Sequence, residues 1–267
     1  MVRYPAAAGQ FYPGTKDELL MYLDSFCRKD TLRVKAKAIV VPHAGYIFSG
    51  KVAGETYSRV EIPPLNVIMG PNHTGLGDPV SVYPGGFWLT PLGEVPVNEE
   101  ITSYLSENNP FSINTDAHIY EHSLEVQVPF LQYCSNFRED LSIVPIVYQY
   151  ISFEDCLVAG EVLAKAVKNR DALIVISTDF SHYVSQEEAK EKDSLAIEAI
   201  LELNEKELYS RVLNYNISMC GVIPATVGII AAKLLGAKSA ELVMYRTSGD
   251  VNGDYSQVVG YAGIIIY

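Results

Sequence analysis

Three of the five histidines stand shortly after runs of apolar side chains. His43 follows the run 39–41, His73 follows the run 67–69, and His182 follows the run 172–176. Such runs are typical of buried parallel strands, and the carboxyl ends of parallel strands meet at one edge of a sheet. Neutral imidazole binds iron, copper or zinc and also acts as a general acid or base. The three positions therefore predict one shared site.

A carboxylate and a thiol are the next candidates for this site. Asp179 lies in the same turn as His182, where it either orients an imidazole through its ring N–H or caps the following turn. Cys220 comes just before an apolar helix predicted from Val222, a place where backbone amides and the helix dipole favour the thiolate. A thiolate binds metal or attacks carbon. The remaining cysteines, Cys27, Cys134 and Cys156, are expected to pack as small hydrophobes.

The segment His118-Ile119-Tyr120-Glu121-His122 has the H-x-x-E-H spacing of a group of zinc peptidases. On a helix the two histidines would share one face and bind zinc, with Glu121 as the general base. The alternative is a helix start with His118 at the surface, while Glu121, His122 and Glu125 line the crevice. The match is short, and those peptidases use a different and much larger scaffold, so the sequence favours the alternative.

The elements that must position these residues alternate between strand and helix. Strands are expected at 37–41, 65–70, 142–147, 172–178, 241–247 and 257–266, with a hairpin in 78–96. Helices are expected after capping boxes at Thr15, Ser152 and Ser185, and over 49–58, 97–106, 120–133 and 222–235. This alternation predicts an α/β fold: one domain, 1–267, with a mainly parallel central sheet and helices on both faces.

Charge and composition exclude several classes of partner. The formal net charge of −12 argues against a nucleic-acid backbone or an anionic membrane surface. No apolar run approaches the roughly 20 residues that span a bilayer, and the first residues lack a signal-peptide core, so a cytoplasmic location is expected. The four cysteines form no C-x-x-C pair, and Gly75-Leu76-Gly77 lacks the rest of a dinucleotide fingerprint. We expect free thiols and no nucleotide.

Several of these segments together resemble the Memo family, whose prokaryotic members are also called system protein B of the AMMECR1–Memo–radical SAM gene grouping. The segments are Pro42-His43-Ala44-Gly45-Tyr46, Gly70-Pro71-Asn72-His73, Glu121-His122-Ser123-Leu124-Glu125, Thr178-Asp179-Phe180-Ser181-His182, Cys220-Gly221, Gly249-Asp250, Gly253-Asp254 and Val259-Gly260-Tyr261-Ala262. The N-terminal stretch 5–13 also matches. The resemblance therefore spans nearly the whole chain.

The resemblance implies a fold similar to class III extradiol dioxygenases, which are non-haem iron enzymes that hold Fe(II) with two histidines and a glutamate. It maps the metal ligands onto His43, His73 and Cys220, with a cysteine in place of the carboxylate. His182 corresponds to an acid/base histidine, and Asp179 to a further polar residue of the pocket. A thiolate ligand shifts the preference toward copper or zinc as well as iron. The implied partners are AMMECR1-like and radical SAM proteins.

Three functions are consistent with this sequence. The first is a metal-binding protein, with iron or copper, that carries out redox chemistry on a small molecule, as a metal-dependent oxidoreductase related to extradiol dioxygenases would. The second is a thiol hydrolase or transferase in which His182 activates Cys220 and Asp179 orients the pair. The third is a metal-free module that binds a peptide or phosphopeptide. The sequence leaves open whether the protein is an enzyme.

Overall fold

Short runs rich in valine and isoleucine form the centre of a nine-stranded sheet in the computed structural model, which describes residues 1–267. Four strands lie side by side and run parallel, in the order β2 (Ala38–Val41), β9 (Ala172–Ser177), β3 (Leu65–Pro71) and β8 (Ser142–Tyr148). Nearly every residue in them is buried, as expected for strands covered on both faces. The predicted parallel sheet is confirmed.

Mostly antiparallel strands extend this centre on both sides. On one side β12 (Val258–Ile266) pairs with β2 and also with β10 (His182–Val184) and β11 (Ala240–Thr247). On the other side β4 (Val80–Val82) pairs antiparallel with β8 and parallel with β7 (Ser112–Ile113). A separate small sheet consists of β1 (Val2–Arg3), β5 (Phe87–Thr90) and β6 (Gly93–Pro96). The hairpin expected within 78–96 is the pair formed by β5 and β6.

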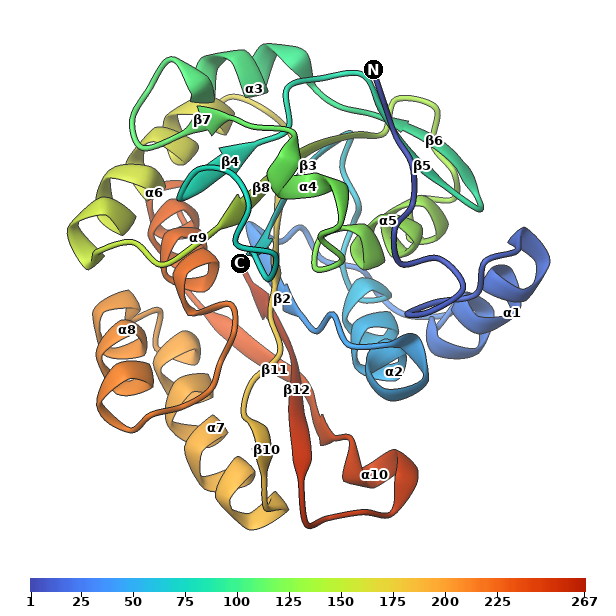
Figure 1. Ribbon diagram of the computed structural model, residues 1–267, viewed down its shortest axis with the longest axis vertical. Helices are drawn as coiled ribbons and strands as arrows, with labels where there is room; N and C mark the ends of the chain where they lie inside the picture. The colour runs from blue at the N-terminus through green and yellow to red at the C-terminus, as the bar shows by residue number, and fades with distance from the viewer.

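Helices cover both faces of the sheet, as predicted (Figure 1). One layer contains α1 (Lys16–Phe26), α2 (Tyr46–Tyr57) and α5 (Val128–Cys134), which lie to the right of the sheet in this view. The other contains α3 (Glu99–Ser106), α6 (Phe153–Val167), α7 (Gln186–Leu201), α8 (Glu205–Asn214) and α9 (Val222–Leu234). Short helical turns, α4 (Asp116–Ile119), η1 (Glu125–Gln127) and α10 (Gly249–Asn252), complete the chain.

Alternate side chains of the strands pack into two separate cores, one on each face of the sheet. Val40 and Met69 pack with α6 and α9 in a core of 43 buried residues, whereas Ile39 and Ile68 pack with α1, α2 and α5 in a core of 30. The helices include none with the length and apolarity needed to cross a membrane.

One expectation about helices was wrong, and one helix was missed. The helix predicted over 120–133 is interrupted, because residues 120–124 form a loop before η1, and Pro129 stands in the first turn of α5. The helix α8 was not predicted. The capping predictions at Ser152 and Ser185 are confirmed, since each hydroxyl accepts a backbone N–H three residues ahead. Thr15 makes no such bond to the backbone and instead pairs with the Glu18 side chain.

Candidate metal centre

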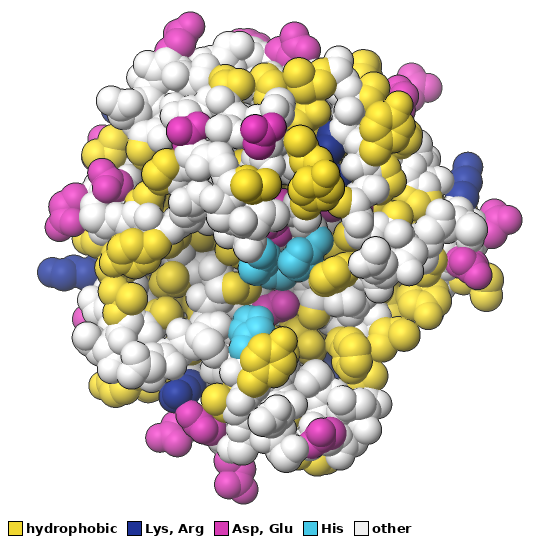
Figure 2. All heavy atoms as spheres, viewed as in Figure 1, with side chains coloured by type: hydrophobic (Ala, Val, Ile, Leu, Met, Phe, Trp, Pro, Cys, Tyr) yellow, Lys and Arg dark blue, Asp and Glu magenta, His cyan; other side chains and the backbone are white.

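Three neighbouring parallel strands each deliver a polar residue two positions past their last residue. His43 follows β2, His73 follows β3, and Asp179 follows β9, which lies between the other two strands. The carboxyl ends of these strands therefore form one edge, where ligands gather in open α/β sheets. Figure 2 shows histidine side chains around a hollow near the middle of the face of the molecule in view.

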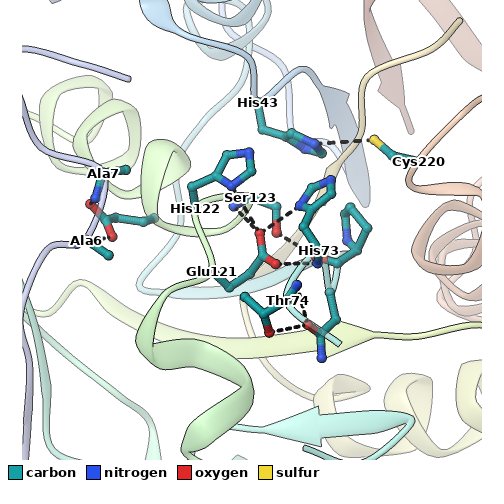
Figure 3. Close-up of polar contacts among 12 residues, drawn as sticks. Ala6, Ala7, His43, His73, Thr74, Glu121, His122, Ser123 and Cys220 are labelled. Atoms are coloured by element: carbon teal, nitrogen blue, oxygen red, sulfur yellow. Dashed lines mark hydrogen bonds and ion pairs between the residues drawn. The ribbon is translucent and has the colours of Figure 1, made fainter. Parts of the chain in front are cut away.

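The histidines that meet there are His43, His73 and His122. Each offers one ring nitrogen to a group in which all three atoms lie within 4.8 Å of one another. The ring centroids of His73 and His122 are 4.8 Å apart with the rings nearly parallel, and those of His43 and His73 are 5.2 Å apart. His122 comes from the loop between α4 and η1, far along the chain from the two strand ends (Figure 3).

The tautomer of His43 follows from the hydrogen bonds of Ser177. The Ser177 hydroxyl donates its one hydrogen to the carbonyl of Ser123, at 2.6 Å, and accepts from the Gln127 amide, at 2.8 Å. Its contact with His43 Nδ1, at 3.0 Å, must therefore be a bond that the imidazole donates. His43 Nε2 therefore carries the lone pair, and it faces the Cys220 sulfur at 3.3 Å. Burial and the nearby His73 lower the pKa of His43, which favours the neutral, metal-binding form.

Glu121 holds the His73 imidazole and lies close to that of His122. Its carboxylate is buried and accepts His73 Nδ1–H at 2.9 Å, the His73 backbone N–H at 2.5 Å and the Ser123 N–H at 2.9 Å (Figure 3). His122 Nδ1 is 3.5 Å from the same carboxylate. Burial alone would raise the pKa of Glu121, but the bond and charge from His73 outweigh it and lower this pKa to about 2. Burial lowers the pKa of His122 to about 4.

Cys220 lies beside His43. Its Sγ is 3.3 Å from His43 Nε2 and 3.3 Å from the Asp179 backbone N, although it is not a member of the three-histidine group. The next residue, Gly221, permits this approach, because a Cβ there would come 2.4 Å from the Thr178 Cβ. Burial and then Asp179 raise the pKa of the Cys220 thiol. The direction is opposite to the thiolate bias predicted from its place before a helix.

Asp179 and His182 lie on the same side of the site as Cys220 and have separate partners. Asp179 accepts the backbone N–H of His43 at 2.8 Å, and burial raises the pKa of its carboxyl to about 6. The His182 ring donates from Nδ1 to the carbonyl of Ser218 at 2.8 Å, so Nε2 is the acceptor nitrogen. The bonds of Cys220 are to His43, Thr178 and Asp179. The structure thus supplies no His182–Cys220 hydrogen bond for the thiol mechanism.

The zinc-peptidase interpretation of H-x-x-E-H is wrong. His118 is fully buried, its Nε2 donates to the Ser81 carbonyl, and its ring packs against Tyr83 and Trp88 rather than beside His122. The alternative that placed His118 at the surface is also wrong, for the same reason. Glu121 and His122 do line the site.

Sequence reasoning missed three features of the site. His122 was predicted as part of the pocket wall, and nothing in its spacing indicates that it joins the two strand-end histidines. Ser177 and Gln127, which fix His43, were not singled out. A serine closing an apolar strand just before Asp179 is a signal that points to Ser177. No comparable signal exists for Gln127.

The donor set fits a metal ion. His43 and His73 each donate from Nδ1 to a protein acceptor, so that Nε2 carries the lone pair, which is the arrangement that outer partners impose on metal-binding histidines. Imidazole suits iron, copper and zinc, and the adjacent Cys220 sulfur adds a softer donor. The three nitrogens define a candidate site without identifying its metal.

Comparison with known proteins identifies the family. A family model described as Memo-like protein matches residues 3–265. The chain belongs to the Memo family. It is 51% identical over 265 residues to a MEMO1 family protein of Aquifex aeolicus, with 99% of this chain and 98% of the relative covered. It is 43% identical over 284 residues to one of Methanocaldococcus jannaschii, with 99% of each covered. For this Memo protein the resemblance seen in the sequence is thereby confirmed.

Proposed function

We propose that this Memo protein binds iron or copper and carries out redox chemistry on a small molecule. The observation that supports the proposal most strongly is the group of three imidazole nitrogens within 4.8 Å of one another. In the proposal His43 and His73 are ligands, and the third donor is Cys220, as the family resemblance implies, or His122. A bound ion of this kind would supply electron transfer to or from the substrate.

The residues around the ion have distinct roles in this proposal. Ser177 and Glu121 orient His43 and His73, and Asp179 holds the turn at His43 through the backbone N–H. His182 takes or gives a proton at Nε2, because Nδ1 is engaged with Ser218. In the proposal the small molecule binds in or near a cavity of about 420 Å³ that Phe11 and Gly45 line, because the Phe11 ring also packs on His122, with 4.2 Å between the ring centroids.

Metal analysis tests the proposal. Protein purified anaerobically is assayed for iron, copper and zinc, together with His43→Ala and His73→Ala, and its fold is checked by circular dichroism. We expect the native protein to carry close to one ion and both variants to lose it. His182→Asn is the matched histidine control, and it should keep the metal while losing turnover. Equal, negligible metal in native and variant proteins would overturn the proposal.

The third ligand is decided by two further variants. If Cys220 is a ligand, Cys220→Ser weakens metal binding. The matched control is Cys156→Ser, which leaves metal binding unchanged, because Cys156 lies in a helix far from the site in sequence. If His122 is the ligand, His122→Asn has this effect and Cys220→Ser leaves the affinity unchanged. Loss in both variants would indicate four donors.

The thiol and peptide-binding functions predict different results. Covalent capture of Cys220 by an electrophile that is equally fast with and without Fe(II) or Cu(I) would favour the thiol mechanism. A phosphopeptide affinity that survives His43→Ala would favour the binding module.

The AMMECR1-like and radical SAM partners and the cytoplasmic location stay part of the proposal. Co-purification of the tagged protein from its own cells tests both partners.

A further inference from the structure

Two buried thiols meet on the side of the molecule opposite the histidines. Cys27 is the residue after α1 and Cys134 is the last residue of α5, and their Sγ atoms are 3.6 Å apart. They stand 107 positions apart in sequence. Cys134 borders a cavity shared with Ala36, Ile62 and Ala172, which lie at or just before the amino ends of β2, β3 and β9. The candidate metal centre is at the carboxyl ends of these strands.

The contact goes beyond simple packing of small hydrophobes. A disulfide needs an S–S separation of about 2.05 Å, so the two sulfur atoms must approach by roughly 1.5 Å. The two thiols lie at the ends of α1 and α5, and these two helices pack against each other. Neither thiol lies on a strand, so the approach needs only these two side chains and the helix ends that carry them to move. We propose that Cys27 and Cys134 form a reversible disulfide.

The pair borders a cavity from which an oxidant would approach. A cavity of about 650 Å³ is lined by both cysteines and by Arg28, Lys29 and Arg33. Arg28 and Lys29 are paired with the carboxylates of Glu55 and Asp24, whereas Arg33 has no ion pair and donates to the Cys134 carbonyl at 2.6 Å. Arg33 is thus the one cation of this cavity without a carboxylate partner, and it can attract a carboxylate of a small-molecule disulfide such as glutathione disulfide.

The reaction is a thiol–disulfide exchange in two steps. Cys27, the more exposed of the two thiols, loses its proton and attacks one sulfur of the small disulfide, which forms a mixed disulfide and releases one thiol. Cys134 then loses its proton and attacks the Cys27 sulfur, which releases the second thiol. Two protein thiols and one small disulfide thus become one protein disulfide and two small thiols.

The bond would tie together the helical layer behind the site. The helix α1 packs on α2, which begins three residues after His43, and α5 follows the loop that carries His122. A cross-link that closes so long a segment restricts the unfolded chain strongly and should raise the unfolding temperature. Oxidised protein is therefore expected to unfold at a temperature several degrees above that of reduced protein.

Mass spectrometry of the full-length protein tests the proposal directly. The folded protein is incubated with glutathione disulfide, quenched in acid, unfolded and alkylated. We expect a mass loss of about 2 Da before alkylation, two protected cysteines, and a linked peptide containing Cys27 and Cys134. Dithiothreitol should reverse all three changes. Four freely alkylated cysteines, or a linked peptide that contains Cys156 or Cys220, would overturn the proposal.

Variants supply the matched controls. Cys156→Ser should form the disulfide and show the same rise in unfolding temperature as the native protein. Cys134→Ser should stop at a mixed disulfide on Cys27 and show no rise. If Cys134→Ser is not folded, Cys27→Ala is used instead, and it should form no disulfide at all. An equal temperature rise in native protein and in either pair variant would contradict the proposal.

Discussion

Glu121 is the residue that fixes the His73 imidazole in the three-histidine group. It binds the ring and backbone of His73 and lies close to His122. We predict that Glu121→Gln lowers metal affinity by about 10-fold to 100-fold, the usual cost of losing an outer partner of a metal-binding histidine. The amide cannot accept at both ends, so one N–H of His73 loses its acceptor. Competition titration with a coloured chelator measures the change.

The control for Glu121 is Glu94→Gln, since Glu94 is exposed in β6 and carries the same charge. It should leave the affinity within experimental error of the native value. A Glu121→Gln protein that is folded and binds metal as tightly as the native protein would show that Glu121 does not position the ligands.

His118 makes the stability of the protein depend on pH. It is fully buried, and burial together with Arg3 lowers its pKa to about 3. The unfolded chain has an ordinary histidine pKa of about 6.5, so below that pH the unfolded state binds a proton that the folded state refuses. Stability must therefore fall as pH falls, by about 1.4 kcal/mol per pH unit between pH 6.5 and about 3.

We predict that His118→Gln removes this loss. Gln keeps an N–H for the Ser81 carbonyl but does not titrate. Between pH 7 and pH 5 the native protein should lose about 2 kcal/mol more stability than the variant, as measured by urea unfolding at each pH. His43 and His122 also have lowered pKa values, but they are present in both proteins and cancel in the difference. Parallel pH profiles would contradict the prediction.

At the level of single residues, the sequence predicted the site residues that lie just past the ends of strands. His43, His73 and Asp179 stand at such ends, and the parallel sheet brings them to one edge. His122 and Gln127 do not follow a strand. They reach the site through the packing of α5 and of the loop that precedes it. No local pattern encodes that packing. The proton on His43 Nδ1 likewise depends on a hydrogen-bond chain through Ser177 that only three-dimensional contacts reveal.

At the scale of elements, the N-terminal segment acts as a tether for the loop that carries His122. Arg3 donates to the carbonyls of His118 and Glu121 and forms a buried ion pair of 2.6 Å with Glu125. The same carboxylate accepts the backbone N–H groups of Ala6 and Ala7, drawn in Figure 3. This tether runs along one side of the loop and brings the following segment, with Phe11, onto His122.

We predict that Glu125→Leu destabilises the protein by about 3–5 kcal/mol, because it leaves the buried Arg3 charge without its ion-pair partner and the Ala6 and Ala7 N–H groups without their acceptor. Adding Arg3→Met should restore part of the loss, since the unpaired cation is then gone. The double variant therefore costs less than the sum of the single variants. Urea unfolding of all four proteins of the cycle gives the coupling energy, and additive costs would show that the pair is not coupled.

The elements themselves were predictable where period and caps agree. The buried strands are continuous apolar runs, and Ser152 and Ser185 begin α6 and α7 as expected. The stretch 120–133 reads as one helix because its apolar residues recur at helical spacing. In the fold, the bonds that Glu121 makes to Ser123 and His73 hold 120–124 as a loop. The hydrogen bonds of one buried carboxylate thus override the local helical preference.

At the scale of the whole molecule, the candidate ligands come from segments that only the complete fold brings together. His43 lies after β2, His73 after β3 and His122 beyond α4, and the unfolded chain keeps no such group. A metal that binds the folded state alone must stabilise it, by about 2.7 kcal/mol when its free concentration is 100 times its Kd. For a chain of this size that corresponds to a rise of roughly 5–10 °C in Tm.

We predict this rise for the native protein titrated anaerobically with Fe(II) or Cu(I), followed by circular dichroism during heating. The rise should grow with the logarithm of metal concentration once the site is saturated, because the linkage is logarithmic. His73→Ala should show no rise, whereas His182→Asn should show the native rise, since His182 moves a proton in the proposal and binds no metal.

A rise of equal size in His73→Ala would mean that the metal stabilises the protein from another place, such as the thiols of Cys27 and Cys134. The same titration of Cys134→Ser separates that case, because a rise that depends on the thiol pair disappears in it and one that depends on the histidines does not.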